Sequence, residues 1–321
     1  MSPAYSGTAP GPFRAVFMGT PEFAVPSLAA LAASQNVTLV MCNPDRPAGR
    51  GRALVSPPVK NEAVRLGIPV FQPEKARGED AAARIKAESP DLIVVVAYGH
   101  ILPRYILDIA RIMCVNVHAS LLPKYRGAAP INWAVAHGEK ETGVTIMKMD
   151  EGMDTGPMLH VRKMPIGDED TSETLFGKLA LLGAEALVET LRMLAAGALV
   201  ETPQDNAAAT YAPMLKKGHG KIDWGRKARE IRDLVRAMTP WPSATTMHRG
   251  KTLKVISCSV LSEDEKAGAP GEILGAGREG ISVACGSGVL LLGAVQPEGG
   301  REMEAWAYAQ GHRIEKEDQL S

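Results

Sequence analysis

An asparagine and a histidine stand two residues apart in the stretch VNVHASLLPKYRGAAPINW, residues 115–133. Alternate side chains of a strand lie on the same face, so Asn116 and His118 are expected side by side. An imidazole exchanges protons near neutral pH, and an amide NH2 can stabilise an oxyanion without ionising. The pair could form half of an acyl-transfer site, and two hydrogen-bonded polar residues at a strand end are the structural alternative.

Two carboxylates follow in the Gly-flanked stretch DEGMDTG, residues 150–156. A carboxylate beside His118 would orient the ring and stabilise its protonated form. Spacing alone does not choose between Asp150 and Asp154, and a solvated acidic loop would contain the same residues.

The elements that position these residues alternate between strand and helix from residue 14 to about 200. The run 92–97 is apolar throughout, as expected of a central parallel strand covered on both faces. This alternation predicts a doubly wound, Rossmann-like α/β domain over 14–200, with ligands at the carboxyl ends of its strands. The expected strands are 15–19, 37–43, 69–72, 91–99, 113–118, 143–150 and 158–164, and the expected helices are 59–67, 79–89 and 172–196.

The pattern changes after residue 200. Residues 201–215 are predicted to be a linker, and a basic helix is expected over 225–238. Short β-rich runs with Gly-rich turns at 244–261, 271–277 and 280–295 favour a small, OB-like β-barrel domain over 216–321. Residues 1–13 are rich in Pro, Gly and Ser and are predicted to be a disordered leader.

Composition excludes several classes of protein. No apolar run is long enough for a membrane span, and the four cysteines are far apart without a CxxC pair. We therefore expect buried free thiols, no metal site and a cytoplasmic location. FMGTPEF, residues 17–23, has one glycine where a dinucleotide site needs three. A helix start is expected there, with Thr20 as N-cap and Pro21 in the first turn, and contacts to the substrate are the functional alternative.

Positive charge is concentrated in two segments, although the 321-residue chain has a formal net charge of zero. Residues 214–258 contain eleven Lys/Arg against three acids, and residues 44–60 contain four against one. The stretch PDRPAGRGR, residues 44–52, is too rich in Pro and Gly to predict a regular element. Such asymmetry indicates a surface for a polyanion, and the alternative is a solvated basic face.

The stretch from Asn116 to Leu159 resembles the formyltransferase family that uses 10-formyltetrahydrofolate. Its SLLPxxRG and ETGVTIMxMDxGMDTG segments make a long and specific match, which extends to residues 17–28 and 43–60 and more weakly to 221–224, 240–242 and the C-terminal barrel. Within the family the chain is most similar to members that formylate the methionine carried by initiator tRNA.

The resemblance implies that Asn116, His118 and Asp154 are catalytic, and so selects Asp154 over Asp150. It implies direct formyl transfer from 10-formyltetrahydrofolate to the α-amino group of methionyl-tRNA, without a metal. The implied folate contacts are Ser120, Leu121, Leu122 and Pro123. The family's tRNA-contacting arginine falls on Arg50, and the charge pattern adds as tRNA-binding candidates Arg46, Arg52, Lys216, Lys217 and Lys221.

Other functions are compatible with parts of this pattern. A formyltransferase acting on an amino-sugar nucleotide, glycinamide ribonucleotide or another small amine would share the Asn/His/Asp core, but would not be expected to carry both basic segments. A hydrolase releasing formate from the same donor is a further variant. A non-catalytic RNA-binding module would leave Asn116, His118 and Asp154 unexplained. We expect a monomer that contacts no membrane.

Overall fold

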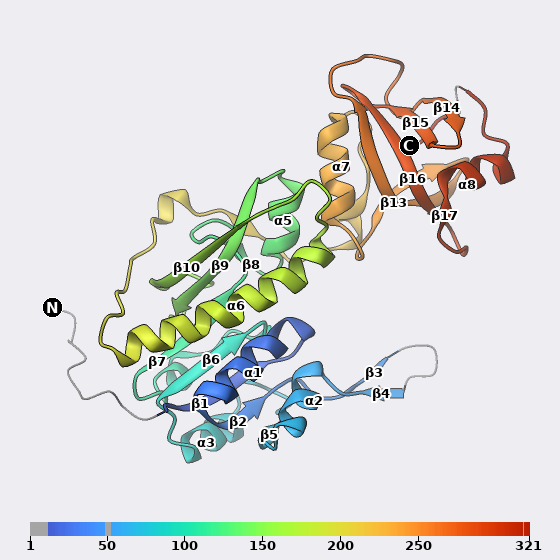
Figure 1. Cartoon of the computed structure of the whole chain (residues 1–321). Coiled ribbons are helices and arrows are strands. Elements are labelled where there is room, and N and C mark those ends of the chain that lie inside the picture. Colours follow the sequence, from blue (N-terminus) through green and yellow to red (C-terminus); the bar gives the residue numbers. More distant parts are fainter. Residues whose placement is uncertain (1–11, 49–52, 317) are drawn as a thin grey trace. The chain divides into compact units, whose positions relative to one another are not determined.

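The computed structural model describes residues 12–48, 53–316 and 318–321 (Figure 1). The chain divides into two compact units. The first contains the residues up to Pro130, together with Glu141–Met164 and Phe176–Ala212, and the second contains Ile131–Lys140, Pro165–Leu175 and Pro213–Ser321. No helix in the described part of the chain is long and apolar enough to cross a membrane.

A seven-stranded sheet with the order β10-β9-β7-β6-β1-β2-β5 forms the centre of the first unit. The strands β7, β6, β1, β2 and β5 are parallel, and β9 runs antiparallel to β7. All seven strands expected from the sequence are confirmed. They are β1 (Arg14–Gly19), β2 (Asn36–Met41), β5 (Val70–Phe71), β6 (Leu92–Val96), β7 (Met113–His118), β9 (Glu141–Lys148) and β10 (Met158–Pro165).

Helices cover this sheet, as the Rossmann-like prediction requires. One face packs Val16, Leu39 and Ile93 against α3 (Glu79–Ala87) and α4 (Arg104–Leu107). The long helix α6 (Ser172–Ala195) lies against β7, since a Cβ added at Gly183 would be only 2.9 Å from Val117 Cγ1. Figure 1 shows α6 running along the sheet, with α1 (Val25–Ser34) beside it and α2 (Pro58–Arg65) beyond.

Residues 44–52 contain the strand β3, so the prediction that they form no regular element was wrong. β3 (Arg46–Ala48) and β4 (Ala53–Val55) pair antiparallel, and Figure 1 shows them extending away from the main sheet. A two-stranded ribbon has two free edges, so Pro47 can join it without removing a needed hydrogen-bond donor.

Two expectations near the start of the chain also need correction. Thr20 does not cap a helix: its Oγ1 accepts a hydrogen bond from the Asn43 N–H at 3.2 Å, and α1 begins at Val25 after a 3-10 turn (η1, Glu22–Ala24). Phe13 was assigned to the disordered leader, but its side chain is buried and its N–H donates to Gln35 Oε1. Residues 1–11 of that predicted leader lie outside the described residues.

Residues 201–212, predicted as part of a linker, belong to the first unit. After the 3-10 turn η2 (Asn206–Ala208), β11 (Tyr211–Ala212) pairs in parallel with β8 (Arg126–Gly127). This pairing attaches the segment to the chain that follows the SLLP turn.

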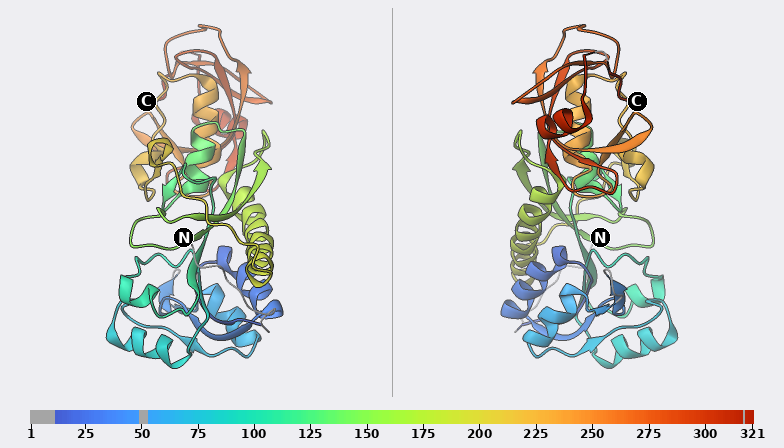
Figure 2. Two further views of the ribbon diagram at one scale, coloured as in Figure 1. Left: turned by 90° about the vertical axis from the view of Figure 1, so that its left-hand side faces the viewer. Right: turned by 90° about the vertical axis from the view of Figure 1, so that its right-hand side faces the viewer.

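The second unit is built on an antiparallel sheet with the order β12-β13-β16-β15-β14, and β17 pairs with β16. Helix α7 packs against β13 (Figure 2). The elements are α5 (Pro130–Ala136), η3 (Lys217–Gly220), α7 (Ala228–Ala237), β12 (Ala244–His248), β13 (Lys251–Ser262), β14 (Ile273–Gly277), β15 (Gly280–Ala284), β16 (Val289–Pro297), β17 (Met303–Glu304) and α8 (Ala305–His312). The basic helix and the β-rich runs predicted after residue 216 are thereby confirmed.

Residues 318–321 join the two edge strands of this sheet. Ile273 N donates to Asp318 O, and Leu320 N donates to Gly271 O, both beside β14. Met247 N in β12 donates to Ser321 O at 2.7 Å, and Leu320 is only 2% exposed. Both edges are therefore covered by one short segment, which satisfies backbone groups that would otherwise be left unpaired.

Leu320→Ala should destabilise the second unit by about 2–5 kcal/mol, the usual cost of truncating a fully buried leucine. The thermal unfolding midpoint of the Leu320→Ala variant should fall by several degrees. Leu261→Ala is the matched control, because Leu261 lies in the same sheet and is 57% exposed. Equal midpoints for the two variants would contradict a closing role for residues 318–321.

Candidate active site

The site begins at the carboxyl end of β7. Asn116 and His118 lie on one face of this strand, and Val117 between them faces α6 on the other. Asn116 Nδ2 donates to Asp154 Oδ1 at 3.4 Å, and His118 Nδ1 lies 3.6 Å from Asp154 Oδ2. The structure therefore brings together the three residues predicted to be catalytic.

A backbone carbonyl holds the His118 ring. His118 Nε2 lies 2.9 Å from Tyr125 O, and because a carbonyl only accepts, Nε2 carries the proton of this hydrogen bond. Nδ1 is left facing Asp154 at ion-pair distance rather than hydrogen-bond distance. The ring is thus positioned by Tyr125 O, while Asp154 supplies a negative charge beside the second nitrogen.

One backbone donor and one side-chain amide hold Asp154. The Gly127 N–H donates to Asp154 Oδ2 at 2.8 Å, and Gln204 Nε2 donates to the carbonyl oxygens of Asp154 and Gly156. Gly127 has φ +117°, and a Cβ there would approach Ala212 O to 2.8 Å, so this donor position requires glycine. Asp154 itself has φ +55°, a conformation that aspartate tolerates better than most residues.

Asp150 has a different environment from Asp154. Its Oδ1 accepts hydrogen bonds from Thr155 Oγ1 at 2.7 Å and from the Gly152 N–H at 3.1 Å. It therefore organises the loop that carries Asp154, and no contact with His118 or Asn116 is present.

The predicted folate-contacting turn is fixed to β9 by one threonine. Thr145 Oγ1 donates to Ser120 O at 2.7 Å and accepts from the Leu122 N–H at 3.2 Å, inside the core. Ser120 and Leu122 are buried, whereas Leu121 and Pro123 remain partly exposed. A ligand could therefore reach Leu121 and Pro123 more readily than Ser120 and Leu122.

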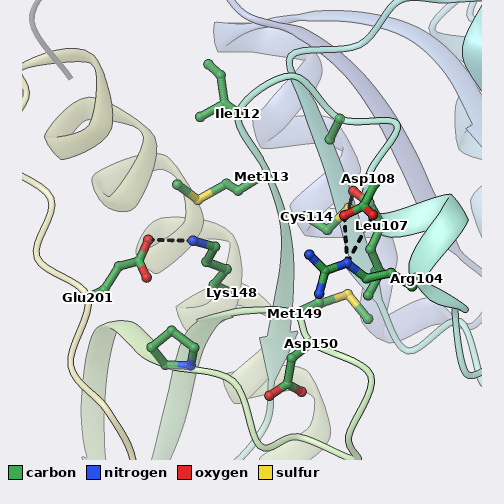
Figure 3. Close-up of a pocket in the computed structure, with 12 residues that line it drawn as sticks. Arg104, Leu107, Asp108, Ile112, Met113, Cys114, Lys148, Met149, Asp150 and Glu201 are labelled. Atoms are coloured by element: carbon green, nitrogen blue, oxygen red, sulfur yellow. Dashed lines mark hydrogen bonds and ion pairs between the residues drawn. The ribbon is translucent and has the colours of Figure 1, made fainter. Parts of the chain in front are cut away.

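A cavity of about 390 Å³ lies in the first unit, beside the loop that carries Asp154 (Figure 3). Its apolar wall includes Leu107, Cys114 and Met149, and Asp150 adds a carboxylate. Figure 3 shows two ion pairs at its sides, Lys148–Glu201 at 2.8 Å and Arg104–Asp108 at 2.9 Å. Burial raises the pKa of the Cys114 thiol to about 12, so this cysteine is a neutral part of the wall.

Some of the predicted tRNA-binding cations can be placed. Arg46 is exposed in β3 and has no ion pair among the described residues, whereas Arg50 and Arg52 lie outside them. Asp45 anchors the base of the hairpin, since it accepts from Lys60 Nζ at 2.6 Å and from Gln72 Nε2 at 2.8 Å. These bonds hold the pKa of Asp45 below its usual value, and the Lys60 charge is paired with Asp45.

The basic segment 214–258 contributes fewer free cations than the sequence count suggests. Arg236 donates to Gly167 O, Asp170 O and Asp233 Oδ1, and Arg232 donates to Asp168. Both arginines attach α7 to residues 167–170 within the second unit. Lys216, Lys217 and Lys221 are exposed and have no ion pair in the described part of the chain.

Sequence reasoning missed the residues that hold the site. Tyr125 and Gly127 act through backbone atoms, and Gln204 comes from a segment predicted as a linker. A residue that acts through its backbone can be of almost any type, so its role is hard to predict from the sequence. Gly127 was nevertheless part of the family pattern, as the final glycine of SLLPxxRG. All four cysteines are free thiols, and the described residues contain no cluster of three or more His, Cys, Asp or Glu side chains suited to a metal ion.

The chain is similar to known proteins over most of its length. Residues 13–191 match the formyl transferase family, and residues 214–313 match the formyl transferase C-terminal domain. A protein of Geobacter metallireducens named methionyl-tRNA formyltransferase is 50% identical over 301 residues, covering 94% of this chain and 96% of its own. A protein of the same name from Sorangium cellulosum is 49% identical over 303 residues, covering 94% and 97%.

Solved structures support the fold. An N-formyltransferase of Helicobacter canadensis, in complex with folinic acid and dTDP-3-aminofucose, has a TM-score of 0.65 at 18% identity and covers 88% of this chain and 98% of its own. HypX of Aquifex aeolicus with tetrahydrofolic acid has a TM-score of 0.60 at 17% identity, covering 96% of this chain and 50% of its own. With two domain matches over most of its length and relatives at half identity, this chain belongs to the formyl transferase family.

Proposed function

We propose that this protein transfers the formyl group of 10-formyltetrahydrofolate to the α-amino group of methionyl-tRNA. The main structural support is the convergence of Asn116, His118 and Asp154 within 3.6 Å at one strand end. The half-identical relatives named methionyl-tRNA formyltransferase favour this acceptor over an amino-sugar nucleotide or another small amine.

In the proposed reaction the methionine amine attacks the formyl carbon, and a C–N bond forms as the formyl oxygen becomes an oxyanion. Asn116 directs one N–H to Asp154 and has a second N–H available for that oxyanion. Collapse of the intermediate breaks the bond to N10 of the folate. The proton lost by the amine goes to N10, and His118 can carry it through Nδ1, because Nε2 is held by Tyr125 O.

Asp154 assists the proton transfer electrostatically. When Nδ1 is protonated, the ring can donate from both nitrogens, to Tyr125 O and toward Asp154. The carboxylate therefore favours the charged ring that forms while the proton is in transit.

The cavity beside Asp150 is our proposed position for the bicyclic pterin ring of the donor. Leu107 and Met149 would contact the flat ring, and the Asp150 carboxylate could accept hydrogen bonds from its amino-pyrimidine edge. Residues 150–155 run from this cavity to Asp154. The pterin ring and the reacting formyl group would therefore lie along one short segment of the chain. Leu121 and Pro123 are the partly exposed folate contacts in this proposal.

We assign tRNA binding to Arg46 of β3, to Arg50 and Arg52, and to Lys216, Lys217 and Lys221 of the second unit. The proposed roles are catalysis for the domain over 14–200 and tRNA binding for the domain over 216–321, although residues 131–140 and 165–175 belong to the second compact unit. The cytoplasmic location and the monomeric state remain predictions.

Incubating the protein with 10-formyltetrahydrofolate and methionyl-tRNA should yield formylmethionyl-tRNA, measured after release of the amino acid. Parallel reactions contain an amino-sugar nucleotide, glycinamide ribonucleotide or no acceptor. Faster transfer to a small amine would replace the proposed acceptor, and formate release without an acceptor would identify a hydrolase.

Salt provides a second test of the acceptor. If lysines and arginines neutralise tRNA phosphates, affinity should fall by roughly 0.7–0.9 log units per log unit of salt for each phosphate contact. A Lys216→Ala/Lys217→Ala/Lys221→Ala variant should bind tRNA more weakly and with a smaller slope. Unchanged affinity and slope would exclude this lysine surface.

A further inference from the structure

Trp241 is unusually exposed for a tryptophan. Its side chain is 53% exposed, and its indole N–H has no hydrogen bond among the described residues. By contrast, Trp224 is buried and donates to Thr246 Oγ1, and Trp133 donates to Pro213 O. The large apolar surface of Trp241 is thus left available to a partner.

The loop that carries Trp241 is held in place. The Ser243 N–H donates to Met238 O at 2.8 Å, and Ser243 Oγ donates to Pro240 O at 2.8 Å. Thr239 Oγ1 donates to Val235 O at the end of α7. Because these bonds fix the backbone on both sides of Trp241, the loop itself loses little conformational freedom when the ring binds a partner.

The lysine turn, defined as residues 216–221, packs directly against this loop. The Ile222 N–H donates to Thr245 O at 2.8 Å, and Lys221 forms a parallel bridge with Thr245. A Cβ added at Gly220 would lie 2.1 Å from Ser243 O and 3.5 Å from Pro242 Cγ, so only glycine permits this approach. The contact places the lysine turn next to the residues that follow Trp241.

The charge of the lysine turn is not compensated nearby. Lys216, Lys217 and Lys221 have no ion pair in the described part of the chain, and Asp223 Oδ1 accepts from the Gly225 N–H. The His219 ring packs edge-on against the Trp133 ring with 5.2 Å between their centroids, and this contact holds the turn to α5 within the second unit. Within the turn, His219 Nδ1 accepts a hydrogen bond from the Lys216 N–H. The result is an ordered cationic turn beside an exposed aromatic ring.

We propose that Trp241 stacks on an unpaired base of the tRNA while Lys216, Lys217 and Lys221 bind the phosphates beside that base. An aromatic face next to flexible cations is the combination that holds single-stranded nucleic acid, because every base has a flat face and every linkage a phosphate. A duplex buries its base faces within its own stack and could use only the lysines. This inference rests on the proposed acceptor and adds recognition of a single-stranded stretch.

The test measures binding of a single-stranded RNA octamer, an RNA duplex of the same length and methionyl-tRNA. Trp241→Ala should weaken octamer binding by about tenfold or more, spare duplex binding, and leave the salt slope unchanged, because no phosphate contact is lost. Trp241→Phe should recover part of the loss. The triple lysine variant should behave differently. Its affinity for octamer and for duplex should depend less steeply on salt concentration than that of the wild type.

Trp306→Ala is the matched control, since Trp306 is a partly buried tryptophan of α8 in the same unit. Wild-type octamer affinity in Trp241→Ala, or an equal loss for octamer and duplex, would overturn the inference. Loss of self-association instead of RNA binding would mean that Trp241 contacts protein, which also overturns it.

If wild type formylates methionyl-tRNA while Trp241→Ala retains all its RNA affinity, only the stacking inference fails. If wild type does not formylate methionyl-tRNA, the proposed function itself fails.

Discussion

His118→Ala should lower kcat for formyl transfer by about a hundredfold or more, the usual effect of removing a general acid–base group. The ring is the only proton carrier in the proposed mechanism, and its orientation is set by the bond from Nε2 to Tyr125 O. Asn116→Ala should have a loss of similar size, because an oxyanion donor would be removed. KM for both substrates should change less than kcat, since neither residue is proposed to supply ground-state binding.

His118 is only 5% exposed, so its loss of activity must be separated from loss of folding. His118→Gln retains an amide that can donate to Tyr125 O but cannot exchange a proton. It should unfold near the wild-type temperature and still be inactive. His160→Ala is the control, because this histidine of β10 pairs with Glu189 and lies outside the proposed mechanism. Near-wild-type turnover in a folded His118 variant would remove His118 from the mechanism.

Asp154→Asn should reduce kcat by about a hundredfold, whereas Asp150→Asn should keep most of the activity. The Gly127 N–H and His118 Nδ1 both face Oδ2, so an amide oxygen kept there leaves the new NH2 at the Oδ1 position, opposite the Asn116 NH2, which is also a donor. The substitution also removes the negative charge that favours the protonated His118 ring in the proposed mechanism. At position 150 an amide oxygen can still accept from Thr155 and Gly152, so the loop should keep its shape.

The measurement is kcat for both variants under saturating donor and methionyl-tRNA, with KM for the donor as a second readout. Because Asp150 lines the proposed pterin cavity, Asp150→Asn should raise that KM while changing kcat little. Comparable kcat losses in the two variants would mean that the loop as a whole, rather than the Asp154 charge, is required.

The cations of residues 214–258 could be counted from the sequence, but their individual roles could not be predicted from it. Counting Lys and Arg over 214–258 identified the basic segment but treated all eleven cations alike. The structure separates Arg232 and Arg236, which bind residues 167–170, from the lysines of the turn 216–221. A count cannot make this distinction, because it depends on which carbonyls and carboxylates the fold brings to each guanidinium.

The sequence by itself determined the seven strands of the first unit, its long helix, the antiparallel β domain and the pair Asn116/His118. These follow from local rules: apolar runs of strand length, helical periodicity and the two-residue repeat of a strand. The choice of Asp154 came from family resemblance, because two acids in one loop are equivalent by spacing.

Only the tertiary structure decided what holds the site and what closes the second unit. Tyr125 O, Gly127 N and Gln204 contact the catalytic residues from 7, 27 and 50 positions away along the chain, and two of them act through backbone atoms that every residue type shares. Residues 318–321 likewise join two edge strands through main-chain hydrogen bonds. Side-chain identity encodes local conformation and burial, whereas backbone partners are set by where distant segments meet, so they became visible only in the folded chain.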